Sequence, residues 1–246
     1  MNKEDTRPSE VDFATLLALV QTGKVVDAIS IIEGISDPMD ASVAFMELSK
    51  QTYRGLQDVS SMVALGNAGT QFALRKAASS ENSADAEKLK TSAKTLAFNT
   101  AANCWPGWGD AGIDIAEEHL QAGLKLSVLC RDLVVELALG HRARGNAHWL
   151  IGALHLAMGQ HAEAIAEFQR AKEESQAGGD ADYVLLAEGY AALAVKAQPE
   201  FRMAGDQELA RILLLLGNRD TKDARFFASQ LITADRVLIG ASRPDA

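Results

Sequence analysis

The sequence contains few prolines and few cysteines, and each scarcity excludes a class of structure. Among its 246 residues there are only five prolines and two cysteines. Because proline breaks helices, its scarcity and the abundance of alanine favour helix almost throughout the chain. The cysteines, Cys104 and Cys130, are too few for a disulfide framework and lack CxxC spacing. We therefore expect an all-α protein with two buried thiols.

The sequence also lacks the segments that would place it in or across a membrane. Its longest apolar run near the C-terminus, Ile212 to Leu216, is far too short to span a bilayer. The N-terminal residues MNKEDTRPSE carry charges, but no apolar stretch follows them as it would in a signal peptide. We therefore expect a cytoplasmic protein with no membrane span.

Positive charge is scarce, and no strongly basic cluster occurs. The chain has 24 Lys and Arg against 33 Asp and Glu, which gives a formal net charge of −9. Binding to a phosphate backbone requires clustered Lys and Arg, so we do not expect a nucleic-acid partner. An acidic surface instead favours basic or neutral ligands.

The apolar residues of the chain are numerous enough to form a large helical core. Apolar side chains make up 48% of the chain, and no window shows sustained two-residue alternation, which disfavours a sheet. Helix start signals and breaks predict about twelve helices joined by short loops, the pattern of a repeat array. After two N-terminal helices, the expected ranges are 38–54, 58–78, 83–103, 111–122, 125–139, 145–158, 161–175, 181–197, 206–216 and 220–238.

The organisation along the chain predicts one helical domain between two polar tails. We expect a disordered tail over residues 1–8, a single repeat domain over 9–240 and a short tail over 241–246. The string WPGWGDAG breaks the helical pattern, so the best candidate for an internal boundary lies near 104–110. Asp37 gives the sharpest helix start, because Asp caps a helix and the following proline fits its first turn.

Residues 147–171 read as two short antiparallel helices joined by a glycine-containing turn. Gly152 fits where two facing helices approach closely, and Gly159 fits the left-handed position that ends a helix. The apolar positions of the second helix recur at helical spacing: Ala164, Phe168 and Ala171. This unit resembles a tetratricopeptide repeat (TPR), which cannot bury its apolar face alone and must stack on neighbouring units.

Two less regular copies support the resemblance. Residues 184–194 align with 147–157 at an offset of 37 residues, near the family's period of roughly 34. Near the N-terminus, Gly23 aligns with Gly159 and Ala28 with Ala164. The resemblance covers residues 11–36 and 145–216. It implies an all-α, right-handed superhelix of antiparallel helix pairs.

The resemblance also implies a binding surface, because the first helix of each unit lines the concave groove of a TPR array. The residues that it places in this groove are Asn146, Trp149, Ala153 and Leu156 in one unit and Tyr183, Leu186 and Tyr190 in the next. Their aromatic rings would form a rigid platform with polar tips. Alternatively, these rings pack between helices and contact no ligand. The positions of the family's carboxylate clamp hold Trp149 and Ala153, so we expect no such clamp.

The segment WPGWGD, residues 105–110, is the most unusual local string. Trp105 and Trp108 bracket a Pro-Gly turn, which allows both rings to fold onto one patch. Two interpretations remain open. Exposed indoles on a loop would form a recognition feature, whereas buried indoles would fill the space between two helix pairs.

The histidines and cysteines do not form a recognisable metal or catalytic motif. His141, His148 and His155 recur every seven residues, so successive rings on one helix would stand about 10.5 Å apart, too far to share an ion. We also expect Gly145 to interrupt the helix between the first two. Nothing in the sequence brings a cysteine next to a histidine, and no phosphate-binding loop is present. We therefore expect neither a metal nor another cofactor.

These observations favour a non-catalytic scaffold that binds a protein or peptide in the concave groove. One alternative is a regulatory sensor of a peptide or small ligand. Another is an α-helical enzyme with a pocket around Trp105, Trp108 and Cys104. We also expect the apolar C-terminal segments LARILLLLG and VLIG to support a homodimer.

Overall fold

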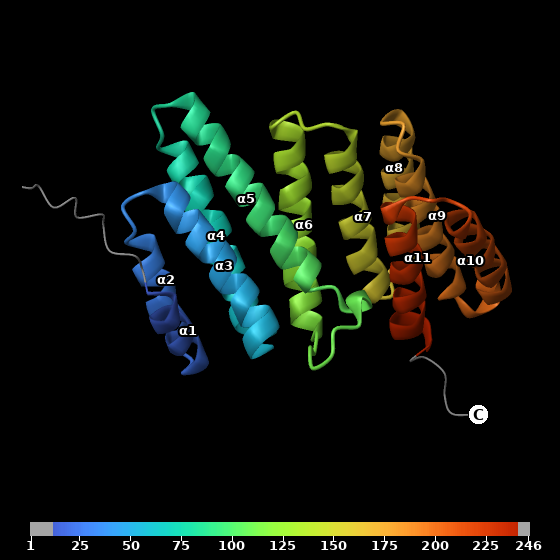
Figure 1. Ribbon diagram of the computed structural model, residues 1–246, viewed down its shortest axis with the longest axis horizontal. Helices are drawn as coiled ribbons and strands as arrows, with labels where there is room; N and C mark the ends of the chain where they lie inside the picture. Colours follow the sequence, from blue (N-terminus) through green and yellow to red (C-terminus); the bar gives the residue numbers. More distant parts are fainter. Residues whose placement is uncertain (1–11, 241–246) are drawn as a thin grey trace, which may run out of the picture. The chain divides into compact units, whose positions relative to one another are not determined.

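The computed structural model describes residues 12–240, and over this range it contains eleven α-helices and no β-strand (Figure 1). The prediction of an all-α fold is confirmed. The tails predicted at 1–8 and 241–246 lie outside the described residues. Within residues 12–240, every helix is too short or too polar to cross a lipid bilayer.

The chain divides into two compact units, residues 1–93 and 94–246. The division falls within helix α5, Ser83–Asn103, rather than at the predicted boundary near 104–110. The WPGWGD segment breaks the helix but does not separate the units, because its tryptophan rings pack against helices of the second unit. A break in helical pattern and a break in packing are therefore different features of this chain.

The first unit is built from helix pairs whose ends follow local rules. Asp37 caps the third helix by accepting a hydrogen bond of 2.7 Å from the Met39 amide, and Pro38 occupies the first turn, as predicted. Gly23, at φ +75°, makes the turn between the first two helices. The helices preceding α5 are α1 Phe13–Gln21, α2 Val25–Glu33, α3 Pro38–Gln51 and α4 Val59–Ala78.

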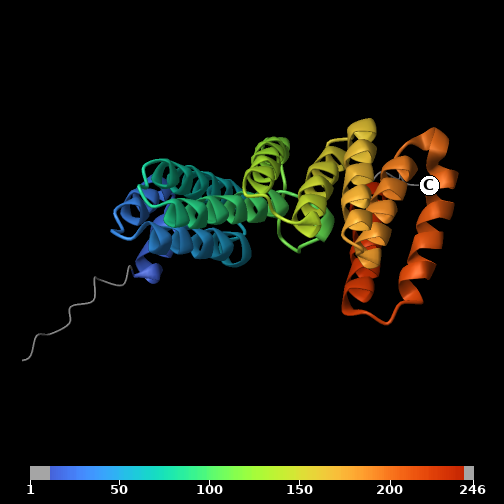
Figure 2. The ribbon, with the colours of Figure 1, turned by 90° about the horizontal axis from the view of Figure 1, so that it is seen from above.

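In the second unit, helices that follow one another in sequence pack against one another. Contacts join α6 to α7, α7 to α8, α8 to α9 and α9 to α10. Figure 2 shows α8, α9 and α10, in gold to orange, lying side by side. Their bounds are α6 Glu117–Glu136, α7 His141–Ala157, α8 His161–Ala177, α9 Ala181–Lys196, α10 Arg202–Gly217 and α11 Lys222–Ala234.

Two expected helix breaks are wrong, and at each of them the helix continues through a glycine. Residues 117–122 and 125–136 of the two expected ranges belong to one helix, α6, which contains Gly123, whereas residues 111–116 are not helical. A Cβ on Gly123 would lie 2.7 Å from Cβ of Cys104, so this glycine permits close packing instead of a turn. Helix α7 likewise continues through Gly145, which is buried. The three histidines of α7 therefore share one unbroken helix.

The α7–α8 hairpin has the glycine roles that the repeat pattern predicts. A Cβ on Gly152 would lie 2.8 Å from the ring of Phe168, which is completely buried. Gly159 adopts φ +72° in the turn between the helices. The missing side chain of Gly152 on α7 therefore leaves room for the ring of Phe168 on α8.

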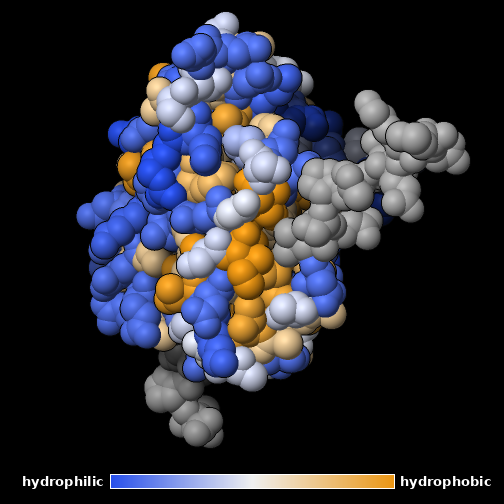
Figure 3. Space-filling view, turned by 90° about the vertical axis from the view of Figure 1, so that its left-hand side faces the viewer, coloured by the Kyte–Doolittle hydropathy of each residue, from blue (hydrophilic) through white to orange (hydrophobic). Residues whose placement is uncertain are grey.

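Large apolar side chains are exposed on the outer helices of both units. On α2, Val26 is 73% exposed, and Figure 3 shows apolar residues gathered on the end of the first unit that carries α1 and α2. On α10, Met203 and Leu214 are 74% and 66% exposed, in the C-terminal region for which the sequence predicts a homodimer.

Candidate binding site

The structure buries two of the three aromatic side chains that the sequence placed on an exposed groove. Trp149 is 8% exposed and Tyr190 is completely buried. Together with the buried Trp105 they form one cluster, with ring centroids 5.5 to 5.7 Å apart. Leu156 and Leu186 are buried as well. The prediction of an exposed aromatic platform is therefore wrong, and the alternative, packing between helices, is what the structure shows.

Other segments of the same chain cover this face of α7 and α9. The short 3-10 helix η2, Pro106–Trp108, lies over the cluster, and the Trp108 indole donates a hydrogen bond of 2.8 Å to the Ala102 carbonyl. Helix α11 packs against both α9 and η2. Leu231 of α11 approaches Gly189 so closely that a Cβ there would lie 2.5 Å from the leucine Cδ1. The surface that the sequence predicted to be an open groove is therefore covered by η2 and α11 of the same chain.

The same contacts decide between the two interpretations of WPGWGD. Trp105 is completely buried and meets Trp108 edge to face at 4.8 Å. Gly107 allows the turn to fold under the ring, because a Cβ there would lie 2.1 Å from Trp105. The segment is a packing element of the second unit.

Two of the predicted residues, Asn146 and Tyr183, lie elsewhere, on the wall of an open cavity of about 790 Å³ in the second unit. The cavity is bordered by the C-terminal half of α5, by α6, by the N-terminal ends of α7 and α9 and by the C-terminal end of α8. Its lining includes Lys94, Phe98, Val134, Gly140, His141, Arg142, Asn146, Glu174, Asp180 and Tyr183.

Both carboxylates in the cavity wall are ion-paired. Arg144 donates to Glu174 over 2.9 Å, and Nδ1 of His141 lies 2.8 Å from the same carboxylate oxygen. Burial alone would raise the pKa of Glu174, but the hydrogen bonds from Arg144 and His141 outweigh it and hold that pKa below its usual range. Nε of Arg142 donates to Asp180 over 2.8 Å. The arginines therefore neutralise the acidic groups of the wall.

Three polar side chains of the wall remain available. Within the described residues, the ammonium of Lys94, the amide of Asn146 and the hydroxyl of Tyr183 make no hydrogen bond or ion pair. The guanidinium of Arg142 lies over the ring of Tyr183, 4.6 Å from its centroid, and thereby fixes one wall. The cavity thus combines rigid charged pairs with polar groups that are free to contact a ligand.

The sequence did not indicate Lys94, Arg142 or Asp180 as site residues. Lys94 lies on α5, far from the other two in sequence, and nothing local connects them. One indication was available for the others, because antiparallel hairpins place the start of α7 beside the end of α8. Residues 140–142 and 178–180 therefore had to meet at one end of the unit.

The cysteines do not supply a reactive thiolate. Cys104 is completely buried, and burial raises its pKa to about 12. Cys130 borders the cavity but is only 1% exposed, and burial raises its pKa to about 11. Both thiols are therefore protonated at neutral pH, so the hypothesis of an enzyme pocket around Cys104 lacks an activated nucleophile. Within residues 12–240, no group of three His, Cys, Asp or Glu is placed to hold a metal ion.

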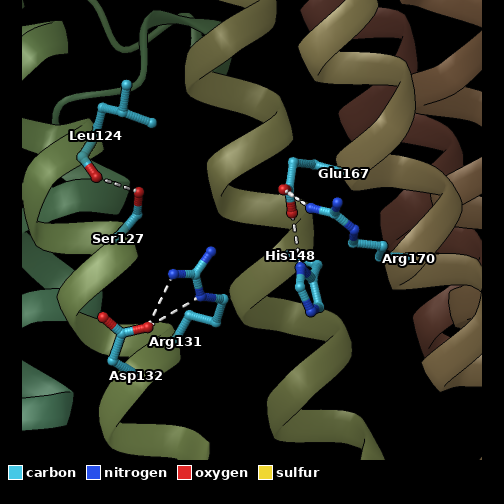
Figure 4. A network of polar contacts seen from close by, with 7 residues as sticks. All are labelled: Leu124, Ser127, Arg131, Asp132, His148, Glu167 and Arg170. Carbon is cyan, nitrogen blue, oxygen red and sulfur yellow. Dashed lines mark hydrogen bonds and ion pairs between the residues drawn. The ribbon is translucent and has the colours of Figure 1, made fainter.

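A separate polar network fixes α7 to α8 (Figure 4). Glu167, which is 7% exposed, lies 2.6 Å from Nδ1 of His148 and also pairs with Arg170. Burial alone would raise the pKa of Glu167, but the His148 hydrogen bond and nearby positive charges lower it below its ordinary value. The network stabilises the hairpin and does not border the cavity.

Replacing Glu167 with glutamine is expected to lower the free energy of unfolding at neutral pH by roughly 1–3 kcal/mol, because a buried hydrogen bond to a charged group is lost. The folded-state pKa of Glu167 lies below the ordinary value of 4.5. Its ionised form therefore stabilises the fold above pH 4.5, and this contribution disappears as the pH falls through the folded-state pKa. Wild type and variant should converge in acid, as measured by urea unfolding across pH.

Glu173→Gln provides the control, because Glu173 is an exposed carboxylate on the same helix. Its effect is expected to be within about 0.5 kcal/mol at every pH. If the loss of unfolding free energy in Glu167→Gln is as small as that in Glu173→Gln and does not change with pH, ionised Glu167 does not stabilise the hairpin.

Searches with the sequence against known protein families and against curated proteins give no match. The candidate site therefore rests on the geometry of the cavity.

Proposed function

We propose that the chain is a TPR-like helical repeat protein that binds a peptide segment of a partner protein without catalysing a reaction. The observation that carries the proposal is the open cavity of about 790 Å³ with its available polar groups. Ligand sites in proteins commonly enclose roughly 300 to 1,000 Å³, and a few placed polar groups fix the ligand's orientation. The helical hairpins around the cavity supply a rigid frame.

The chemistry of the wall favours a peptide, because a peptide backbone offers both donors and acceptors. Lys94 and Tyr183 can donate, and the Asn146 amide can donate and accept. The Arg-paired carboxylates Glu174 and Asp180 each keep an oxygen for which no hydrogen bond is formed within the described residues. Phe98 and Val134 add apolar surface for a side chain of the ligand.

Filling the cavity should abolish binding without disturbing the fold. Gly140 lies in the cavity wall and has φ −66°. A Cβ added to it would meet no atom of the described residues within 4 Å. Gly140→Phe is therefore expected to place a ring in the cavity at little cost in stability. Pull-down from host lysate, read by mass spectrometry, should then lose the partner that wild type retains.

Gly217→Phe is the matched control, because its Cβ also meets nothing within 4 Å and Gly217 does not border the cavity. A partner that wild type and Gly217→Phe retain and Gly140→Phe loses supports the cavity as the site. A synthetic peptide from that partner should then bind wild type at least about tenfold more tightly than Gly140→Phe. Identical partners for all three proteins, or none for wild type, would refute the proposal.

A further inference from the structure

The first turn of α9 carries side chains that alternately contact the cavity wall and the beginning of α11. On the cavity side, Asp180 accepts a hydrogen bond from Arg142, and the ring of Tyr183 lies beneath the same guanidinium. These contacts tie the start of α9 to the start of α7. The neighbouring residue Asp182 contacts a different set of partners.

On the other side, Asp182 holds the N-terminus of α11. Its carboxylate is buried, accepts a hydrogen bond of 2.6 Å from the Thr221 hydroxyl and pairs with Arg219. Thr221 in turn caps α11 by accepting a hydrogen bond of 3.0 Å from the Ala224 amide. The first turn of α11 is thus attached to the first turn of α9.

Tyr183 is the residue common to both sides. Its ring contacts Arg142 in the cavity wall and meets Phe227 of α11 edge to face at 4.8 Å. Burial raises the pKa of Tyr183, so its hydroxyl remains neutral while its ring packs between the two neighbours. Any movement of this ring therefore changes both the cavity wall and the surface against which Phe227 of α11 packs.

We infer that occupancy of the cavity and docking of α11 are linked, so that a bound ligand tightens α11 against the aromatic cluster. The inference rests on the proposed function, because it describes the regulation of the same cavity. Docked α11 supports the cavity wall through Phe227, which packs against the same Tyr183 ring that Arg142 contacts. A ligand that requires this wall binds the docked form more tightly, and docking raises ligand affinity by the same factor.

The linkage can be tested without a ligand by perturbing the cavity side and observing α11. Arg142 holds Asp180 and the Tyr183 ring, and it also attracts Asp223 in the first turn of α11. The comparison is therefore made in an Asp223→Asn background, which removes this direct attraction from every protein compared. Arg142→Gln in the full chain is therefore expected to accelerate hydrogen exchange of the α11 amides on the order of 2- to 30-fold. Exchange in the α7–α8 hairpin should be unchanged, which shows that the second unit remains folded.

Two further variants serve as a negative and a positive control. Arg131→Gln is the matched control, because Arg131 pairs with Asp132 on α6 and lies outside the cavity. Phe227→Ala removes the α11 side of the contact and should accelerate α11 exchange directly. If Phe227→Ala accelerates α11 exchange and Arg142→Gln does not, the linkage is refuted. It is also refuted if Arg131→Gln has the same effect as Arg142→Gln.

The tryptophans supply a second readout. All three tryptophans of the chain, Trp105, Trp108 and Trp149, belong to the aromatic cluster between η2, α7 and α9, and α11 packs against η2 and α9. Undocking of α11 should therefore shift their emission to longer wavelength in Arg142→Gln and not in Arg131→Gln. Because neither readout uses a ligand, the linkage can hold where the pull-down fails, and it can fail where a partner is found.

Discussion

Gly205→Ala is expected to destabilise the second unit by about 3 kcal/mol, although alanine normally stabilises a helix by about 1 kcal/mol relative to glycine. Gly205 lies in the first turns of α10, where that helix crosses α9. A Cβ at this position would lie 2.4 Å from the backbone nitrogen of Lys196 and 2.5 Å from its Cα. Because backbone atoms of a packed helix cannot move aside as a side chain can, the two helices would have to separate.

Urea unfolding followed by tryptophan fluorescence measures this effect, because all the tryptophans lie in the second unit. Gly217→Ala, in the same helix, is the control. No atom of residues 12–240 lies within 4 Å of its added Cβ, so we expect no loss of stability and a gain of up to about 1 kcal/mol. Equal effects of the two substitutions would contradict the close approach of α10 to α9.

The parts of the fold that the sequence predicted correctly depend on contacts between residues that are near in sequence. Asp37 and Pro38 start a helix through hydrogen bonds within one turn. Gly152 faces Phe168 within one hairpin. Such features recur wherever the local pattern recurs, and a single sequence is enough to recognise them.

The covered groove could not be predicted in this way. Gly189 aligns with Gly152 in the repeat pattern, yet it faces Leu231 of α11 and not the following helix of its own hairpin. The ring of Trp105 meets that of Tyr190, which is distant in sequence. No local pattern states where a final helix packs, so aromatic residues that would line an open groove became the core beneath α11.

The candidate site was predicted in part for the same reason. Asn146 and Tyr183 were identified because they occupy repeat positions, and both line the cavity. Lys94 comes from a helix outside the recognisable repeats. The binding surface that we propose therefore lies at the helix ends and not on the aromatic face, and Arg142 and Asp180 place charge there beside Tyr183.

Burying the tryptophans also changes what a mutation at these positions reports. A charged residue at Trp149 or Tyr190 would be forced into the core, where an unpaired charge is strongly destabilising. Loss of binding in such a variant would reflect loss of the fold. Substitutions at the cavity, such as Gly140→Phe, separate the two effects because the site has room for the new side chain.

Trp105→Ala is expected to cost about 3–5 kcal/mol of unfolding free energy, the range for truncating a buried aromatic side chain. The ring is completely buried and contacts three others, those of Trp108, Trp149 and Tyr190. Its removal would leave a cavity at the point where η2, α7 and α9 meet. The measurement is urea unfolding, followed by the fluorescence of the two remaining tryptophans and by circular dichroism.

Trp105→Phe separates the ring from its polar atom. Among residues 12–240, the indole nitrogen of Trp105 is buried without a hydrogen-bond partner, and an unsatisfied buried donor costs about 1–3 kcal/mol. Phenylalanine keeps an aromatic ring and removes that donor, so its smaller volume and the lost donor should nearly cancel, leaving a change of about 1 kcal/mol or less. A cost below about 1 kcal/mol for Trp105→Ala would show that the ring is not a core element. A large cost for alanine together with a small one for phenylalanine would show that Trp105 acts in this unit through its packing alone.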